Sequence, residues 1–165
     1  ALAIKKEPKI IDRIEIIWLG GNEIEYKDNL EYNFKQDIEA VKIVFDSTVK
    51  ITILPCKNVV SDLRIDIAEL KSKLDNRKEL NKYLIERFYN DGYHGIQETR
   101  VIWDISVIAY MINKNWFNTM EVSCPLINTD NTFKLTENRH SVKFVNYLNA
   151  NEIFKDLFSK LTDNN

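Results

Sequence analysis

The sequence predicts an α/β fold: an open, mostly parallel sheet flanked by helices, with a small strand-rich patch near the C-terminus. The first observation is that short apolar runs ending in turn residues alternate with segments of helical periodicity. The second is size and composition, because 165 residues with 44% hydrophobic side chains can bury the core of one ordinary domain.

The first third of the chain contains a predicted βαβ unit. An apolar run closed by Gly20-Gly21 is typical of a buried strand that ends in a turn, and a polar loop, a helix and a second apolar strand follow it. This order indicates a parallel sheet. The predicted elements are the last turns of a helix at 1–8, a strand at 13–19, a loop at 22–30, a helix at 35–46 and a strand at 50–55.

The rest of the chain is predicted to hold helices and then short strands. Apolar residues recur at helical spacing from Ile67 to Phe88, with a break near Asp75-Asn76, and a glycine-bearing loop follows at 90–95. Another helix is predicted from Val101 to Asn113. The remaining predicted elements are strands at 121–126, 132–135 and 142–148 and a terminal amphipathic helix at 152–161.

Charge and composition narrow the possible functions. The 23 basic and 25 acidic residues are mixed along the chain, so no basic stripe is available for nucleic acid or an anionic membrane. No apolar run approaches the roughly 18 residues of a membrane span, and the four glycines form no phosphate-binding loop. Cys56 and Cys124 lack metal-ligand spacing and are predicted to be buried apolar residues. We expect a small molecule or another protein as partner, and the cytoplasm is the favoured compartment.

Asp104 is the first candidate for chemistry because it follows Trp103 at the head of an otherwise apolar predicted helix. An unpaired carboxylate buried there would be costly, so we expect it to have a partner. One interpretation is a helix N-cap, which position alone favours. The other is an oxygen ligand for a hard cation such as Ca²⁺. Trp103, at the presumed helix start, is placed to stack on a flat heterocycle.

Glu31 and Asn33 are the second candidates, two positions apart at the end of the loop after the glycine turn. Their acceptor and mixed donor and acceptor groups suit the hydroxyls of a sugar. The alternative is a polar loop in which Asn33 caps the next helix. Tyr93 and His94 are candidates for a flexible lid, although neither His94 nor His140 shows a paired acid nearby in the sequence.

Taken together, these stretches occur in the same order as in a known family. The chain resembles the C-terminal half of the inosine–uridine-type nucleoside hydrolases. The matching segments are Trp18-Leu19-Gly20-Gly21, Glu31-Tyr32-Asn33-Phe34 with Asp37-Ile38-Glu39-Ala40, Val101-Ile102-Trp103-Asp104, and the closing segments at 142–145 and 154–158.

The resemblance implies hydrolysis of the N-glycosidic bond of ribonucleosides to free base and ribose, with Ca²⁺ holding the ribose. Asp104 matches the family's C-terminal calcium ligand, and Glu31 and Asn33 match residues that hydrogen-bond the ribose. Asp37 matches a structural position at a helix start. Trp103 stands where the pyrimidine-tolerant branch has histidine, which favours purine nucleosides as substrates.

The resemblance also implies that part of the family's catalytic site is missing from residues 1–165. The family's aspartate-rich loop, which carries the other calcium carboxylates and the general base, does not occur between Ala1 and Asn165. We expect residues 1–165 to be the C-terminal part of a single nucleoside hydrolase-like domain, inactive in isolation and forming a homo-oligomer or needing a complementing N-terminal segment. Two alternatives stay open: a catalytically inactive nucleoside- or ribose-binding module, and a structural fragment that completes another chain's sheet.

Overall fold

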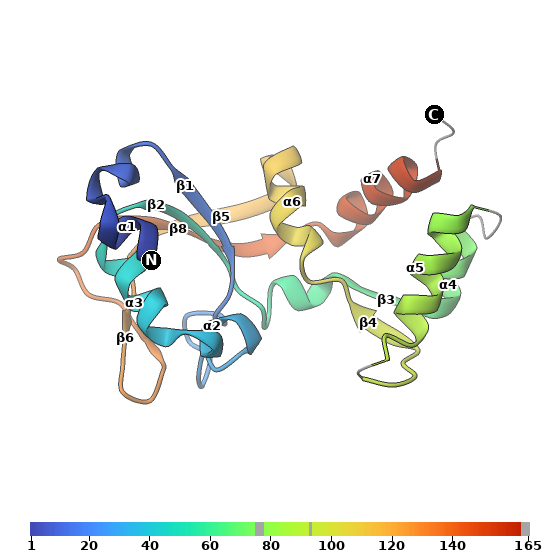
Figure 1. The fold of residues 1–165 in the computed structure, drawn as a ribbon, viewed down its shortest axis with the longest axis horizontal. Helices are drawn as coiled ribbons and strands as arrows, with labels where there is room; N and C mark the ends of the chain where they lie inside the picture. Colours follow the sequence, from blue (N-terminus) through green and yellow to red (C-terminus); the bar gives the residue numbers. More distant parts are fainter. Residues whose placement is uncertain (75–77, 93, 163–165) are drawn as a thin grey trace. The chain divides into compact units, whose positions relative to one another are not determined.

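The computed structural model describes residues 1–74, 78–92 and 94–162. The chain forms two compact units, which we call the sheet unit (Ala1–Ser61 and Trp103–Leu148) and the helical unit (Asp62–Ile102 and Asn149–Asn165). Figure 1 shows the helices and strands, coloured along the sequence from blue at the N-terminus to red at the C-terminus. Among the described residues, no helix is long and apolar enough to cross a membrane.

The sheet unit is built on four strands in the order β1-β2-β8-β5. The strands β1, β2 and β8 are parallel, and β5 pairs with β8 in the antiparallel direction. This confirms the predicted open, mostly parallel sheet. The strand bounds are β1 Glu15–Leu19, β2 Lys50–Leu54, β5 Phe117–Ser123 and β8 Ser141–Leu148.

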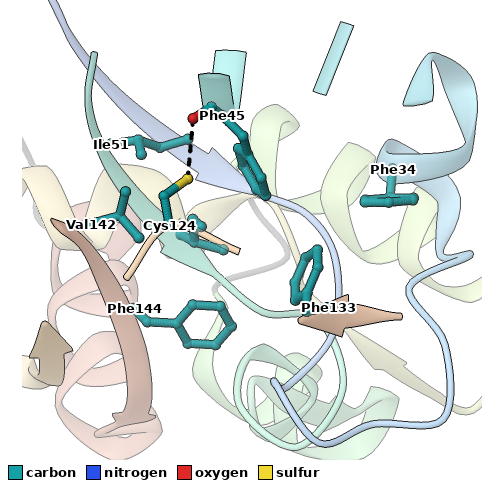
Figure 2. Close-up of a cluster of buried hydrophobic side chains, with 8 residues drawn as sticks. Phe34, Phe45, Ile51, Cys124, Phe133, Val142 and Phe144 are labelled. Atoms are coloured by element: carbon teal, nitrogen blue, oxygen red, sulfur yellow. Dashed lines mark hydrogen bonds between the residues drawn. The ribbon is translucent and has the colours of Figure 1, made fainter. Parts of the chain in front are cut away.

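An aromatic core lies between the sheet and its neighbouring segments (Figure 2). Phe133 makes ring contacts with Phe34, Phe45 and Phe144, so residues from four separate segments meet there. Trp18 is partly buried and packs against the same core, as expected for an aromatic residue in a strand. Cys124 is also buried in this core, and Cys56 is buried elsewhere in the sheet unit; both are free cysteines, as predicted.

Helices and short strands complete the sheet unit. The 3-10 helix η2 (Val60–Asp62) follows the loop after β2 and runs to the boundary with the helical unit. The other elements are α1 Leu2–Lys6, η1 Pro8–Asp12, α2 Tyr32–Gln36, α3 Ile38–Asp46, α6 Ile105–Ile112, η3 Lys114–Trp116 and the antiparallel pair β6 Leu126–Ile127 and β7 Phe133–Lys134.

In its described residues, the helical unit contains a two-stranded antiparallel ladder and three helices. Its core includes Ile65, Leu70, Phe88 and Phe158, which come from widely separated parts of the sequence. Phe154 and Phe158 stack on one face of the terminal helix. The elements are β3 Arg64–Asp66, α4 Ile67–Lys73, α5 Glu79–Tyr89, β4 Thr99–Val101 and α7 Ala150–Thr162.

Two predicted helices have different bounds in the structure. The helix predicted at 35–46 is split into α2 and α3, because the Asp37 side chain accepts from Ala40 N at 2.9 Å and starts a new helix. The helix predicted from Val101 begins at Ile105, because Thr99–Val101 pair with β3 and Ile102 N continues to Leu63 O at 2.8 Å. The break predicted at Asp75-Asn76 lies outside the described residues.

The strands near the C-terminus also differ from the prediction in their bounds. Pairing begins at Phe117 and ends at Ser123, rather than covering 121–126. Most of β5 is exposed, so the apolar pattern that marks buried strands is weak there. The strand predicted at 132–135 is reduced to β7, a two-residue pairing with β6.

Candidate functional site

The candidate site begins where β1 and β2 end at the same edge of the sheet. Gly20 N donates to Leu54 O at 3.1 Å, and Cys56 N donates to Gly21 O at 2.9 Å. The segments that follow β1 and β2 therefore stay hydrogen-bonded beyond the ends of the strands. Gly21 has a φ of 70°, and a Cβ there would lie 2.8 Å from the Phe133 ring. The positive φ and the close Phe133 ring each require glycine at position 21. Loops at the carboxyl ends of parallel strands are the usual ligand-binding positions in open α/β sheets.

Glu31 caps α2 and at the same time holds the glycine turn. Its Oε1 accepts from Gly21 N at 2.9 Å and from Phe34 N at 2.5 Å, and its Oε2 accepts from Asn33 N at 2.7 Å. The sequence offered Asn33 as the cap of the next helix, and the structure assigns the cap hydrogen bonds of α2 to Glu31 and those of α3 to Asp37. Three backbone hydrogen bonds fix the orientation of the Glu31 carboxylate.

Asn33 lies beside the end of β1. Its Nδ2 donates to Leu19 O at 2.9 Å, which joins the first turn of α2 to the last residue of the strand. The preceding loop is held by two buried asparagines: Asn22 N donates to Asn29 Oδ1 at 2.7 Å, and Asn22 Oδ1 accepts from Lys57 N at 3.2 Å. These buried amides are hydrogen-bonded and hold the loop in one conformation. The positions of Glu31 and Asn33 at its end are fixed as a result.

Cys56 lies just beyond the end of β2, and it is buried. Burial raises the pKa of its thiol above the ordinary value, the charge of Glu31 raises it further, and Asp104 adds a smaller increase while Lys57 lowers it. Lys57 follows Cys56 directly, and Glu31 and Cys56 are both hydrogen-bonded to the backbone of Gly21. Hydrogen bonds join the segments that follow Leu19 and Leu54, and α6 contacts β1.

Asp104 occupies the N-cap position of α6 without acting as a side-chain cap. It has helical dihedrals, and its carboxylate makes no cap hydrogen bond. It is also exposed, so the expectation of a buried carboxylate with a necessary partner was wrong. Water solvates the charge here, and within the described residues no hydrogen bond or ion pair of this side chain is found. Trp103 next to it is half-buried, and its carbonyl accepts from Ser106 N at 3.2 Å.

These donors do not by themselves form a calcium site. Ca²⁺ takes roughly 6–8 oxygen ligands, whereas three backbone N–H groups already use the Glu31 oxygens. Across the described parts of the chain, no group of three or more His, Cys, Asp or Glu side chains is arranged to hold a metal ion. The Asp104 carboxylate, in contrast to that of Glu31, is exposed and makes no cap hydrogen bond.

Of the two proposed lid residues, the structure describes His94, which belongs to the helical unit. Tyr93 lies outside the described residues. His94 Nδ1 lies 2.6 Å from Asp91 Oδ2, and the same oxygen accepts from Arg100 Nη1 at 2.9 Å. The expectation that His94 has no paired acid nearby in sequence was therefore wrong, and the aspartate three positions earlier was the overlooked signal. The other histidine, His140, is half-buried, and burial followed by the charge of Arg139 lowers its pKa.

The fold and the arrangement of the site define the class of protein. It is an open-sheet α/β protein whose glycine turn, held by the Glu31 carboxylate, lies at the carboxyl ends of parallel strands, where such folds bind ligands. The chain belongs to the inosine-uridine preferring nucleoside hydrolase family, whose model matches residues 1–155. Among curated protein sequences, no match was found.

Solved structures of nucleoside hydrolases share this fold. The inosine-uridine preferring nucleoside hydrolase of Bacillus anthracis matches with 17% identity and a TM-score of 0.73, over 97% of this chain and 55% of that one. A plant nucleoside hydrolase matches with 15% identity and a TM-score of 0.77, over 99% and 58%. An inosine-guanosine nucleoside hydrolase matches with 10% identity and a TM-score of 0.74, also over 99% and 58%. The chain thus spans between 55% and 58% of the length of these proteins.

Proposed function

We propose that this chain carries the ribose-binding part of a nucleoside hydrolase, an enzyme that cleaves the N-glycosidic bond of ribonucleosides to give free base and ribose. The observation that carries the proposal is the glycine turn at the carboxyl end of β1, where Gly21 is hydrogen-bonded to Cys56 and three backbone N–H groups hold the Glu31 carboxylate. Family membership and fold support the reaction class.

In this proposal Glu31 and Asn33 orient the ribose. Glu31 is held by three backbone donors and Asn33 by Leu19, so both side chains are preorganised before substrate arrives. Hydrogen bonds to sugar hydroxyls that strengthen in the transition state stabilise the oxocarbenium-like charge of glycoside hydrolysis. The contribution of these two residues is therefore orientation and electrostatic stabilisation.

Asp104 is proposed as one ligand of Ca²⁺, since its carboxylate is exposed and makes no cap hydrogen bond. When bound, such an ion positions the ribose and lowers the pKa of a bound water. The remaining ligands and the general base are proposed to come from residues other than 1–165, in the same protein or in a partner chain. This chain spans between 55% and 58% of the matching nucleoside hydrolase structures, which is consistent with a need for ligands and a base from other residues.

Purine nucleosides such as inosine, adenosine and guanosine are the proposed substrates. Trp103 directly precedes Asp104 and is only half-buried, so part of its indole surface is available to a flat base. Stacking against an aromatic ring favours larger heterocycles and depends little on hydrogen-bond pattern. The lid role of Tyr93 and His94 and a homo-oligomeric assembly remain part of the proposal.

A second candidate function is a nucleoside- or ribose-binding module without catalysis. One observation favours it: the described residues contain no cluster of metal-ligating side chains, and the Glu31 carboxylate already has three backbone donors. A module of this kind would bind ribose or nucleoside and leave the glycosidic bond intact.

Product analysis separates the two functions. The full-length protein that carries this chain is incubated with inosine and Ca²⁺, and hypoxanthine and reducing sugar are measured against a sample containing a calcium chelator. Equal release of both products, lost on chelation, supports the hydrolase. Inosine binding without release of either product supports the binding module, and absence of binding excludes both.

A further inference from the structure

The strand β1 has the sequence of an interior strand but lies at an edge of the sheet. Four of its five residues, Ile16 to Leu19, are apolar, as in parallel strands that are buried on both faces. Yet Ile16, Ile17 and Trp18 are only half-buried, whereas the residues opposite them in β2 are buried. Among the described residues, β2 is the only strand that pairs with β1. One side of an apolar strand is therefore left open.

The other edge of the sheet is protected against further pairing, and β1 is not. Sheet edges avoid unwanted pairing with charged residues, prolines or β-bulges. The edge strand β5 has an irregularity between Asn118 and Thr119, carries the charged Glu121 and is mostly exposed. In β1 the register with β2 is continuous over all five residues, and its one charged residue, Glu15, is the first. An edge without protection is typical of a strand that pairs on both sides.

Two hydrogen bonds show which backbone groups of β1 face the open side. Gly20 N donates to Leu54 O and therefore faces β2. Successive residues of a strand direct their backbone groups to alternate sides, so those of Leu19 and Ile17 face away from β2. In agreement with this, the Leu19 carbonyl accepts from Asn33 Nδ2 of α2 at 2.9 Å. A further strand can therefore pair with β1 at Ile17, and Asn33 ends the pairing at Leu19.

An apolar cavity of about 220 Å³ lies beside this open side. Ile16 and Trp18 line it from β1, and Val41 and Val44 line it from α3. Asn33, whose side chain is bonded to the outward carbonyl of the strand, is also in its wall. Protein cores are close-packed and hold few voids larger than a water molecule. The cavity therefore fits an apolar side chain supplied by another segment.

The matching structures indicate what covers the edge. This chain spans between 55% and 58% of the three nucleoside hydrolases with which it shares a fold, so each of them has further residues in the same chain. A strand from such a remaining part can pair with the open side of β1, and the side chains on one of its faces can enter the cavity. One end of this strand would lie beside Asn33 and the glycine turn, next to the candidate site.

We propose that β1 is an interior strand of the full-length protein: a strand from outside residues 1–165 pairs with it at Ile17, and an apolar side chain of that strand fills the cavity between β1 and α3. The occupant is the remaining part of a nucleoside hydrolase-like domain, so the inference rests on the proposed function and deepens it. Strand pairing is measured without substrate, and inosine turnover is measured separately, so the two can fail independently.

Amide hydrogen exchange in the full-length protein, followed by NMR, tests the pairing directly. The matched amide is that of Glu121 in β5. Cys124 N donates to His140 O at 2.8 Å, so alternation directs the Glu121 N–H away from β8. After correction for sequence, the Ile17 N–H should exchange at least about 100-fold more slowly than the Glu121 N–H, because it donates to another strand. Exchange of the Ile17 N–H as fast as that of Glu121 would overturn the proposal.

Nuclear Overhauser contacts of the Ile17 N–H identify the strand that protects it. Contacts with residues outside 1–165 of the same molecule are expected. A sample that mixes isotope-labelled and unlabelled protein separates contacts within one molecule from contacts between two. Contacts of Ile17 with residues 15–19 of a second copy would assign the edge to a dimer and overturn the proposal.

Ala40→Leu tests the cavity by the sign of its effect on the stability of the full-length protein. Ala40 lines the cavity, and its backbone N–H, which Asp37 caps, is unchanged by the substitution. If a side chain from another strand fills the cavity, the larger residue overpacks it and the urea midpoint falls. Ala3→Leu, at an exposed position of α1, is the matched control and should change little. A urea midpoint that Ala40→Leu raises or leaves unchanged would show that the cavity is empty and contradict the proposal.

Discussion

The Asn33 side-chain amide donates to the Leu19 carbonyl at 2.9 Å and joins the start of α2 to the end of β1. We predict that Asn33→Ala lowers the free energy of unfolding by about 1–3 kcal/mol, because a partly buried carbonyl loses its donor. Urea denaturation measures this loss. Asn118→Ala, at an exposed position of β5, is the matched control and should change little. Equal stability of the two variants would show that the amide contributes nothing to the turn.

The cap of α3 gives a prediction that concerns stability and not substrate binding. Asp37 accepts from Ala40 N at 2.9 Å, so Asp37→Ala should destabilise the protein by about 1 kcal/mol. Asp37→Asn should be almost neutral, because asparagine caps helices about as well. Thermal unfolding of both variants checks this. A similar loss in the two would point to a role for the charge in place of the cap.

Much of the secondary structure around the site could be predicted from the sequence, because the spacing of apolar residues indicates which side chains are buried. The C-terminal ends of the first two strands were predicted within one residue. Asp37 lies at a helix start, as the family resemblance implied. The roles of Glu31 and Asn33 could not be separated, since both residue types are polar and stand before a helix. Only the geometry assigns the cap of α2 to Glu31 and a strand contact to Asn33.

Other features depend on tertiary contacts that no local pattern encodes. Val101 and Ile102 continue the apolar pattern of α6, yet Val101 pairs with β3 and Ile102 N donates to Leu63 O, so the helix begins later than predicted. The exposure of Asp104 was missed for the same reason, because an apolar helix beyond it suggested burial. The link between Glu31 and Cys56 through Gly21 joins separate segments, which a linear pattern does not reveal.

Stability at high pH should depend on Cys56. Burial and then Glu31 raise the pKa of its thiol above 9.0 in the folded protein. Above that pH the unfolded chain releases the thiol proton while the folded chain keeps it, so the free energy of unfolding falls as pH rises. Stability from this group is fully present below pH 9.0. Cys56→Ala should therefore show a shallower alkaline decline in urea midpoints. Parallel declines in the variant and the wild type would contradict the buried thiol.

The role of Trp103 is tested by comparing two classes of base in the full-length protein. If the indole stacks on the leaving base, Trp103→Ala should reduce kcat/KM for inosine by roughly 1–3 kcal/mol of transition-state stabilisation. The loss for uridine should be smaller, because a pyrimidine offers less stacking surface. Equal losses for the two substrates would assign Trp103 a packing role.

The central claim is that Asp104 binds Ca²⁺ in a nucleoside hydrolase, and Asp104→Asn tests it most directly. Asparagine removes the negative charge and keeps the size of the side chain, and the carboxylate makes no cap hydrogen bond that could be lost. The measurement is calcium titration by calorimetry beside inosine turnover, on full-length wild type and variant with matched Tm. We predict far weaker calcium binding and a loss of turnover by orders of magnitude in the folded variant. Unchanged calcium affinity with full turnover would contradict the account.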